Sequence, residues 1–144
     1  MSDVIREKAS VLLARLDREI ARADASTVAV GGITKVGTDL EALLRVVASA
    51  ACKSQGSSLD AEITRRKLVR GAGTYARILG EARAGLDAIG DALARDLRAP
   101  RSRVQALVDL RNANSHSAEL PPAYKQTLTS VATLLRPLVG GEAQ

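Results

Sequence analysis

Apolar residues recur at three- and four-residue steps along most of this chain, which is the spacing of one buried face on an α-helix. The pattern predicts a first helix over residues 2–23. It predicts a second helix that begins at a capping box made by Thr38 and Glu41 and ends in the polar run 53–58. Most of the chain is therefore expected to bury helix faces against one another.

Four further helical segments are expected after this run, each bounded by residues that cap or interrupt helices. They are a segment from Ser57 or Ser58 to Arg70, a longer helix carrying 75–97 that Ala99 and Pro100 end, a short helix opened by a capping box of Ser102 and Gln105, and a last helix from Pro121 and Pro122 to Pro137.

The segment 26–37 fits two descriptions. Its apolar and β-branched residues around Gly31 and Gly32 are typical of a short hairpin, but Ile33 and Val36 also keep the spacing of the helix that follows. Because an isolated hairpin is only marginally stable, we favour a loop that leads into that helix.

The composition agrees with one all-α domain over residues 1–144, folded as a helical bundle. Apolar residues make up 46% of the chain and aromatic residues only 1%, so the core must consist of aliphatic side chains. Without Phe or Trp, and with only two Tyr, the chain lacks the aromatic platform on which many single-strand binders stack bases.

The net charge and the cysteine content limit which partners and cofactors the protein is expected to have. A formal charge of +5 allows an anionic partner. With one cysteine, Cys52, and one histidine, the chain is expected to hold no internal disulfide, metal or other cofactor. The charged N-terminus and the short apolar run at 46–52 predict a cytoplasmic protein with no membrane partner.

The only histidine lies in the hexapeptide Arg111-Asn112-Ala113-Asn114-Ser115-His116, where one helical pattern stops before the next begins. Arginine binds phosphate through two parallel N–H donors, and imidazole transfers protons near neutral pH. This combination predicts cleavage of RNA without metal. The alternative is structural: Arg111 and His116 would only satisfy the last carbonyl groups of their helix.

Residues 108–116, a short loop and a Pro-initiated amphipathic helix together resemble the motif of HEPN domains, in which Arg, a polar residue and a few more residues precede His. HEPN domains are four- or five-helix bundles, and many are metal-independent ribonucleases. The resemblance implies a homodimer in which two motifs form one composite site near the helices 102–116 and 121–136. It assigns phosphate binding to Arg111, proton transfer to His116 and orientation of the site to Asn112.

The resemblance also implies a toxin or phage-defence effector, with a cognate antitoxin or a larger defence-system protein as a further partner. Other HEPN domains are not catalytic. The alternative function is therefore a HEPN-like dimerisation module that binds RNA or a protein.

Two basic clusters are candidates for contact with RNA. Each is equally described as a solvated helix face that needs no function. The clusters are Arg65, Arg66, Lys67 and Arg70, and Arg101 with Arg103.

Overall fold

A computed structural model describes residues 2–24, 30–82, 86–114 and 124–140. Over these ranges the chain forms seven α-helices and no strand, which confirms the all-α class. The helices are α1 (Ser2–Asp24), α2 (Val30–Ser54), α3 (Leu59–Arg66), α4 (Ala72–Gly80), α5 (Ala88–Arg98), α6 (Arg103–Asn114) and α7 (Tyr124–Gly140).

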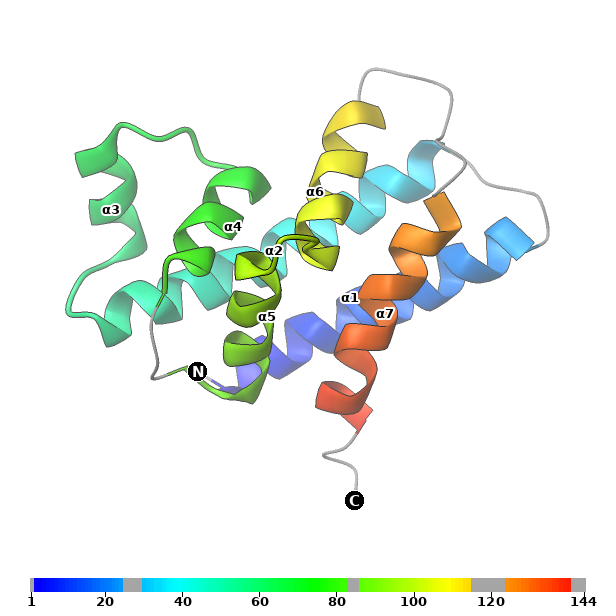
Figure 1. The fold of residues 1–144 in the computed structure, drawn as a ribbon, viewed down its shortest axis with the longest axis horizontal. Helices are drawn as coiled ribbons and strands as arrows, with labels where there is room; N and C mark the ends of the chain where they lie inside the picture. The colour runs from blue at the N-terminus through cyan, green and yellow to red at the C-terminus, as the bar shows by residue number, and fades with distance from the viewer. Residues whose placement is uncertain (1, 25–29, 83–85, 115–123, 141–144) are drawn as a thin grey trace.

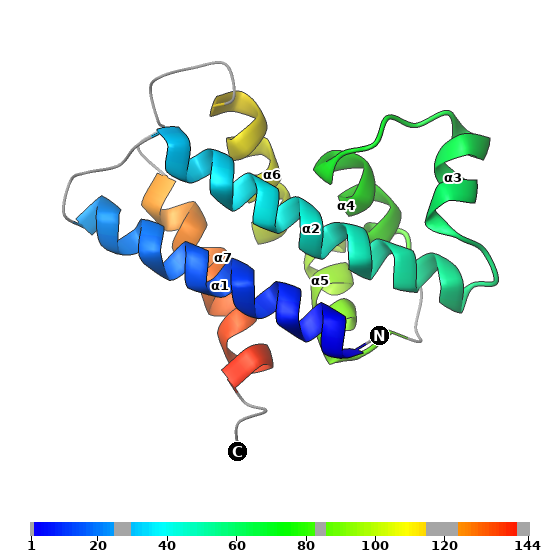
Figure 2. The same cartoon turned by 180° about the vertical axis from the view of Figure 1, so that it is seen from behind.

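The helices form two layers (Figure 1). The long helices α1 and α2 run antiparallel, side by side, and make up one layer, which Figure 2 shows in front. The shorter helices α4, α5, α6 and α7 cover the other side of this pair, and α3 contacts α2 near its C-terminal end. The C-terminal ends of α1 and α6 and the N-terminal ends of α2 and α7 meet at one end of the molecule, which we call the motif end.

The core between the layers is almost entirely aliphatic, as the composition predicts. Its largest fully buried side chains are leucines from six helices, with Ile33 of α2 and Glu19 of α1. Tyr75 and Tyr124 are both buried at its margin. No helix in the described ranges is long and apolar enough to cross a membrane.

The start of α2 differs from the prediction. The helix already includes Val30, so both the loop that we favoured and the hairpin alternative are wrong for residues 30–37, while 26–29 lie outside the described residues. Thr38 caps nothing, because it lies inside α2 and its hydroxyl donates to the carbonyl of Thr34 at 3.1 Å. Burial of Ile33 and Val36 explains the difference, since both lie on the stripe that α2 packs into the core.

Two other helix boundaries were also predicted wrongly. The segment that Ser58 caps ends at Arg66 rather than Arg70, because Lys67 adopts a left-handed conformation (φ 55°) and closes the helix. The single helix expected over 75–97 is two helices, α4 and α5, and the Asp87 carboxylate caps the second by accepting from the Gly90 amide at 2.8 Å.

The end of α7 was predicted too early, since Pro137 lies inside the helix. Leu138 and Val139 beyond it pack against the core, which offsets the backbone hydrogen bond that proline cannot donate. Other boundaries are confirmed: the polar run ends α2 at Ser54, Ala99 follows the last residue of α5, and the Ser102 hydroxyl accepts from the Gln105 amide at 3.0 Å.

Candidate functional site

Helix α6 carries the first part of the hexapeptide to the motif end. Its N-terminus is fixed by Asp96 of α5, whose carboxylate accepts from the Ser102 hydroxyl at 2.7 Å and from the Val104 amide at 2.9 Å. The apolar face of α6 is buried against α2 and α7, which sets the rotation of the helix. This face consists of Val104, Leu107, Val108 and Leu110.

With α6 held in this way, Arg111 and Asn112 lie in its last described turn. The Arg111 Nη1 donates to Oδ1 of Asn112 at 3.3 Å, so the two motif residues are in contact. His116 lies outside the described residues.

Arg111 is half-buried because it lies directly over Gly37 of α2. A methyl group at Gly37 would overlap Cγ of Arg111, at 2.7 Å from its Nε and 2.9 Å from its Cδ. The absence of a side chain at this one position therefore gives the arginine its place across the α2 backbone. Sequence reasoning missed Gly37, and no motif distinguishes it from the chain's other glycines.

Two buried polar groups lie at the motif end. Glu19 of α1 is fully buried, and neither of its carboxylate oxygens accepts a hydrogen bond from a described residue, while Arg22 Nη1 lies 3.4 Å from Oε2. The Tyr124 hydroxyl, at the start of α7, is also buried and has no hydrogen-bond partner in the described part of the chain. Burial, together with the charge of Glu19, raises the pKa of Tyr124 to about 12, while the charge of Arg22 acts in the opposite direction.

The sequence carries a signal that marks Glu19 as unusual. Glu19 follows Leu16 by three residues and therefore falls on the apolar stripe of α1. A carboxylate on a buried stripe is unusual, because burying a charge is costly unless it is paired or hydrogen-bonded.

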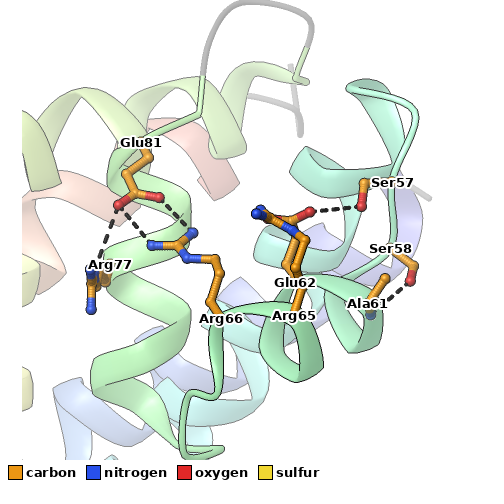
Figure 3. Close-up of polar contacts among 8 residues, drawn as sticks. All are labelled: Ser57, Ser58, Ala61, Glu62, Arg65, Arg66, Arg77 and Glu81. Carbon is orange, nitrogen blue, oxygen red and sulfur yellow. Dashed lines mark hydrogen bonds and ion pairs between the residues drawn. The ribbon is translucent and has the colours of Figure 1, made fainter.

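The basic cluster on and after α3 is largely neutralised by acids of the same region (Figure 3). Arg66 donates to both carboxylate oxygens of Glu81, at 2.8 and 3.1 Å, and this hydrogen bonding lowers the pKa of Glu81. Arg65 pairs with Glu62 at 2.5 Å, and its hydrogen bond is the main cause of the lowered pKa of Glu62.

The rest of this cluster follows the same trend. Arg70 pairs with Asp60 at 2.8 Å, which leaves Lys67 as an exposed cation at the C-terminus of α3. Helix α3 also lies far from the motif end (Figure 1). The structure therefore does not bring this cluster together with Arg111.

The second basic cluster lies in a different setting. Arg101 and Arg103 are exposed at the start of α6 and line a groove between α6 and α7. Lys125 of α7 lines the same groove. Sequence reasoning did not select Lys125, because it stands alone among uncharged residues in the chain.

The described residues contain no group of three or more side chains that could hold a metal ion. Cys52 is a buried free cysteine, and burial is the main cause of its raised pKa. A buried thiol in this state is a poor nucleophile.

A scan against protein-family models and searches of curated proteins and of solved structures returned no match to this chain. The resemblance to HEPN domains therefore rests on the motif residues of the sequence.

Proposed function

We propose that this protein is a metal-independent endoribonuclease of the HEPN type, acting in the cytoplasm as a homodimer. Its composite site would combine Arg111, Asn112 and His116 from both subunits. The observation that carries the proposal is the position of Arg111. Its side chain lies over Gly37 and contacts Asn112 in the last described turn of α6, five residues before the only histidine.

The chemistry requires three actions. Arg111 binds the phosphate and stabilises the charge that gathers on its oxygens in the transition state. His116 accepts the proton of the 2′-hydroxyl, whose oxygen then bonds to phosphorus and expels the 5′-oxygen of the next nucleotide. His116 of the partner subunit donates a proton to that leaving oxygen. The products are a 2′,3′-cyclic phosphate and a 5′-hydroxyl.

A ribonuclease of this kind would damage its own cell if uncontrolled. We therefore extend the proposal to a toxin or phage-defence role, with a cognate antitoxin or a larger defence-system protein as partner. The four- to five-helix HEPN arrangement belongs to the same proposal. The longest helices, α1 and α2, with α6 and α7 packed on them, would be its equivalent here.

The test is cleavage of total RNA in the presence of EDTA, with product ends mapped. We expect cyclic-phosphate ends from the wild type and no cleavage by Arg111→Ala or His116→Ala. Arg95→Ala is the matched control, because Arg95 is an exposed arginine on α5, away from the motif. Equal cleavage by all three variants would identify a contaminating nuclease and refute the proposal.

The second candidate function is a non-catalytic HEPN-like module that dimerises and binds RNA or a protein. The groove that Arg101 and Arg103 line favours it, because this groove offers cations without any catalytic group. In that case the wild type would bind RNA and leave it intact.

A further inference from the structure

The groove between α6 and α7 is chemically uniform. Its described lining offers positive charge, hydroxyl groups and one amide, and includes no carboxylate and no aromatic ring. Its main hollow is lined by Arg103, Lys125, Gln126, Thr129, Ser130 and Thr133. A second hollow adds Arg101 and shares Arg103, Gln126 and Ser130 with the first, so the two are continuous.

The cations of this groove lie where the helices themselves disfavour them. Arg103 opens α6 and Lys125 is the second residue of α7, and neither helix has an acidic residue in its first turn. Because the N-terminal end of a helix carries partial positive charge, a cation there lowers stability. The nearby acid Asp96 accepts hydrogen bonds from the Ser102 hydroxyl and from backbone amides of α6, rather than from the guanidinium groups of the groove.

The contrast with α3 identifies what the groove can bind. Arg65, Arg66 and Arg70 are each paired with a carboxylate, whereas Arg101 and Arg103 form no ion pair with any described acid. Unpaired arginines can bind phosphate oxygens. Threonine, serine and glutamine side chains both donate and accept hydrogen bonds, which suits the 2′-hydroxyl of RNA.

We propose that the α6–α7 groove is a binding site for the sugar-phosphate backbone of single-stranded RNA. The groove contacts phosphates through Arg101, Arg103 and Lys125 and contacts 2′-hydroxyls through the polar side chains of α7. Base stacking is not expected, because none of the described residues that line the groove is aromatic. Arg103 and Arg111 lie eight residues apart on α6, about 12 Å along the helix axis, so one strand can reach both.

This inference rests on the proposed function only for its choice of RNA as the substrate class. The experiment measures binding rather than cleavage, so the two can fail separately. All proteins carry His116→Ala, and the probe is a fluorescein-labelled single-stranded RNA whose integrity is checked on a gel. Fluorescence anisotropy gives the Kd at several salt concentrations.

Two triple variants carry the same change in charge. The groove variant has Arg101→Glu, Arg103→Glu and Lys125→Glu. The α3 variant has Arg65→Glu, Lys67→Glu and Arg70→Glu. The groove variant should fold, because glutamate in the first turn of a helix is favourable. Circular dichroism checks that the groove variant is folded, and the single variant Arg103→Gln provides a milder change at the same site.

We expect the groove variant to lose binding and to reduce the slope of log affinity against log salt by about 2. We expect the α3 variant to keep most of both. Equal losses in the two variants would mean that only net charge matters, and loss in the α3 variant alone would place the site there. Either result overturns the proposal, as does equal affinity for DNA of the same sequence.

The proposed catalytic mechanism is tested separately, by comparing RNA cleavage by His116→Ala with that by the wild type. If the groove variant loses binding while His116→Ala still cleaves RNA at the wild-type rate, the groove stands and the nuclease mechanism fails. If the groove variant binds RNA normally and His116→Ala does not cleave RNA, the proposed binding groove is refuted and the nuclease mechanism is supported.

Discussion

Arg111 owes its position to a missing side chain on a neighbouring helix. Gly37 lies in the middle of α2, where glycine costs roughly 0.5–1 kcal/mol relative to alanine. The closeness of Gly37 to Arg111 explains why glycine is present despite its lower helix stability, because a methyl group would occupy the space of the arginine side chain. If Arg111 acts as proposed, stability and activity are therefore opposed at this position.

The variant Gly37→Ala tests the effects of this position on stability and on RNA cleavage separately. We expect the variant to remain folded, with a melting temperature near that of the wild type, because the gain in helix propensity offsets the repacking of Arg111. RNA cleavage should fall strongly, since Arg111 must leave its place. Gly73→Ala is the control, because nothing lies near a methyl group at that position of α4. A fully active Gly37→Ala protein would show that this placement of Arg111 is unimportant.

Tyr124→Phe tests the buried hydroxyl at the motif end. Because this hydroxyl has no hydrogen-bond partner, its removal should leave stability unchanged or raise it by about 1 kcal/mol at neutral pH. Urea denaturation of wild type and variant measures the difference. A loss of more than about 1 kcal/mol would mean that the hydroxyl is in fact hydrogen-bonded.

The same tyrosine predicts a pH dependence. Its pKa is raised from 10.0 to about 12 in the folded protein, so between these values the unfolded chain has lost the proton and the folded chain keeps it. The free energy of unfolding contributed by Tyr124 is therefore fully present below about pH 10 and is lost as pH rises toward 12. The advantage of Tyr124→Phe over wild type should grow across this window, and a constant difference would contradict the burial of the hydroxyl.

At the scale of the helices, the N-terminus of α6 depends on one carboxylate from another helix. Asp96 accepts from the Ser102 hydroxyl and from two backbone amides. We expect Asp96→Ala to cost roughly 1–3 kcal/mol, as the loss of a cap and of hydrogen bonds to a charged group does. Asp109→Ala on α6 is the control, because Asp109 is exposed and the hydrogen bond that it accepts from the Gln105 side chain lies at the surface. Equal melting temperatures for the two variants would contradict this role of Asp96.

The helices show which structural features local sequence determines. The first helix, the Ser58 cap and the Ser102 cap were predicted correctly, because each depends on residues a few positions apart. The start of α2 and the end of α7 were not, because packing of residues such as Ile33 and Leu138 outweighs nearby Gly and Pro. The periodic pattern across 75–97 likewise continued through a break, since both α4 and α5 face the same core.

The candidate site follows the same division. The motif, Arg111 and the basic residues at the start of α6 are visible in the sequence. The packing of Arg111 over Gly37 and the position of Lys125 in the α6–α7 groove are not visible in the sequence, because both arise from contacts between residues far apart along the chain. The neutralisation of Arg66 by Glu81, fifteen residues later, is equally invisible to local pattern.

At the scale of the whole molecule, the proposed mechanism predicts a homodimer. A composite site needs two copies of the motif, so α6 and α7 should lie near the interface. Light scattering should give the mass of two protomers across micromolar concentrations, for the wild type and for His116→Ala alike. A single-protomer mass throughout would leave the reaction without its second proton-transfer group.

The most direct test of the central claim is the single-turnover rate of RNA cleavage in EDTA by His116→Ala, compared with the wild type. The account predicts a loss of at least about 100-fold, as for removal of a general acid–base group, with a free energy of unfolding changed by no more than about 0.5 kcal/mol. The opposite result, destabilisation of about 1 kcal/mol with an unchanged rate, would mean that His116 only caps its helix, and would contradict the claim.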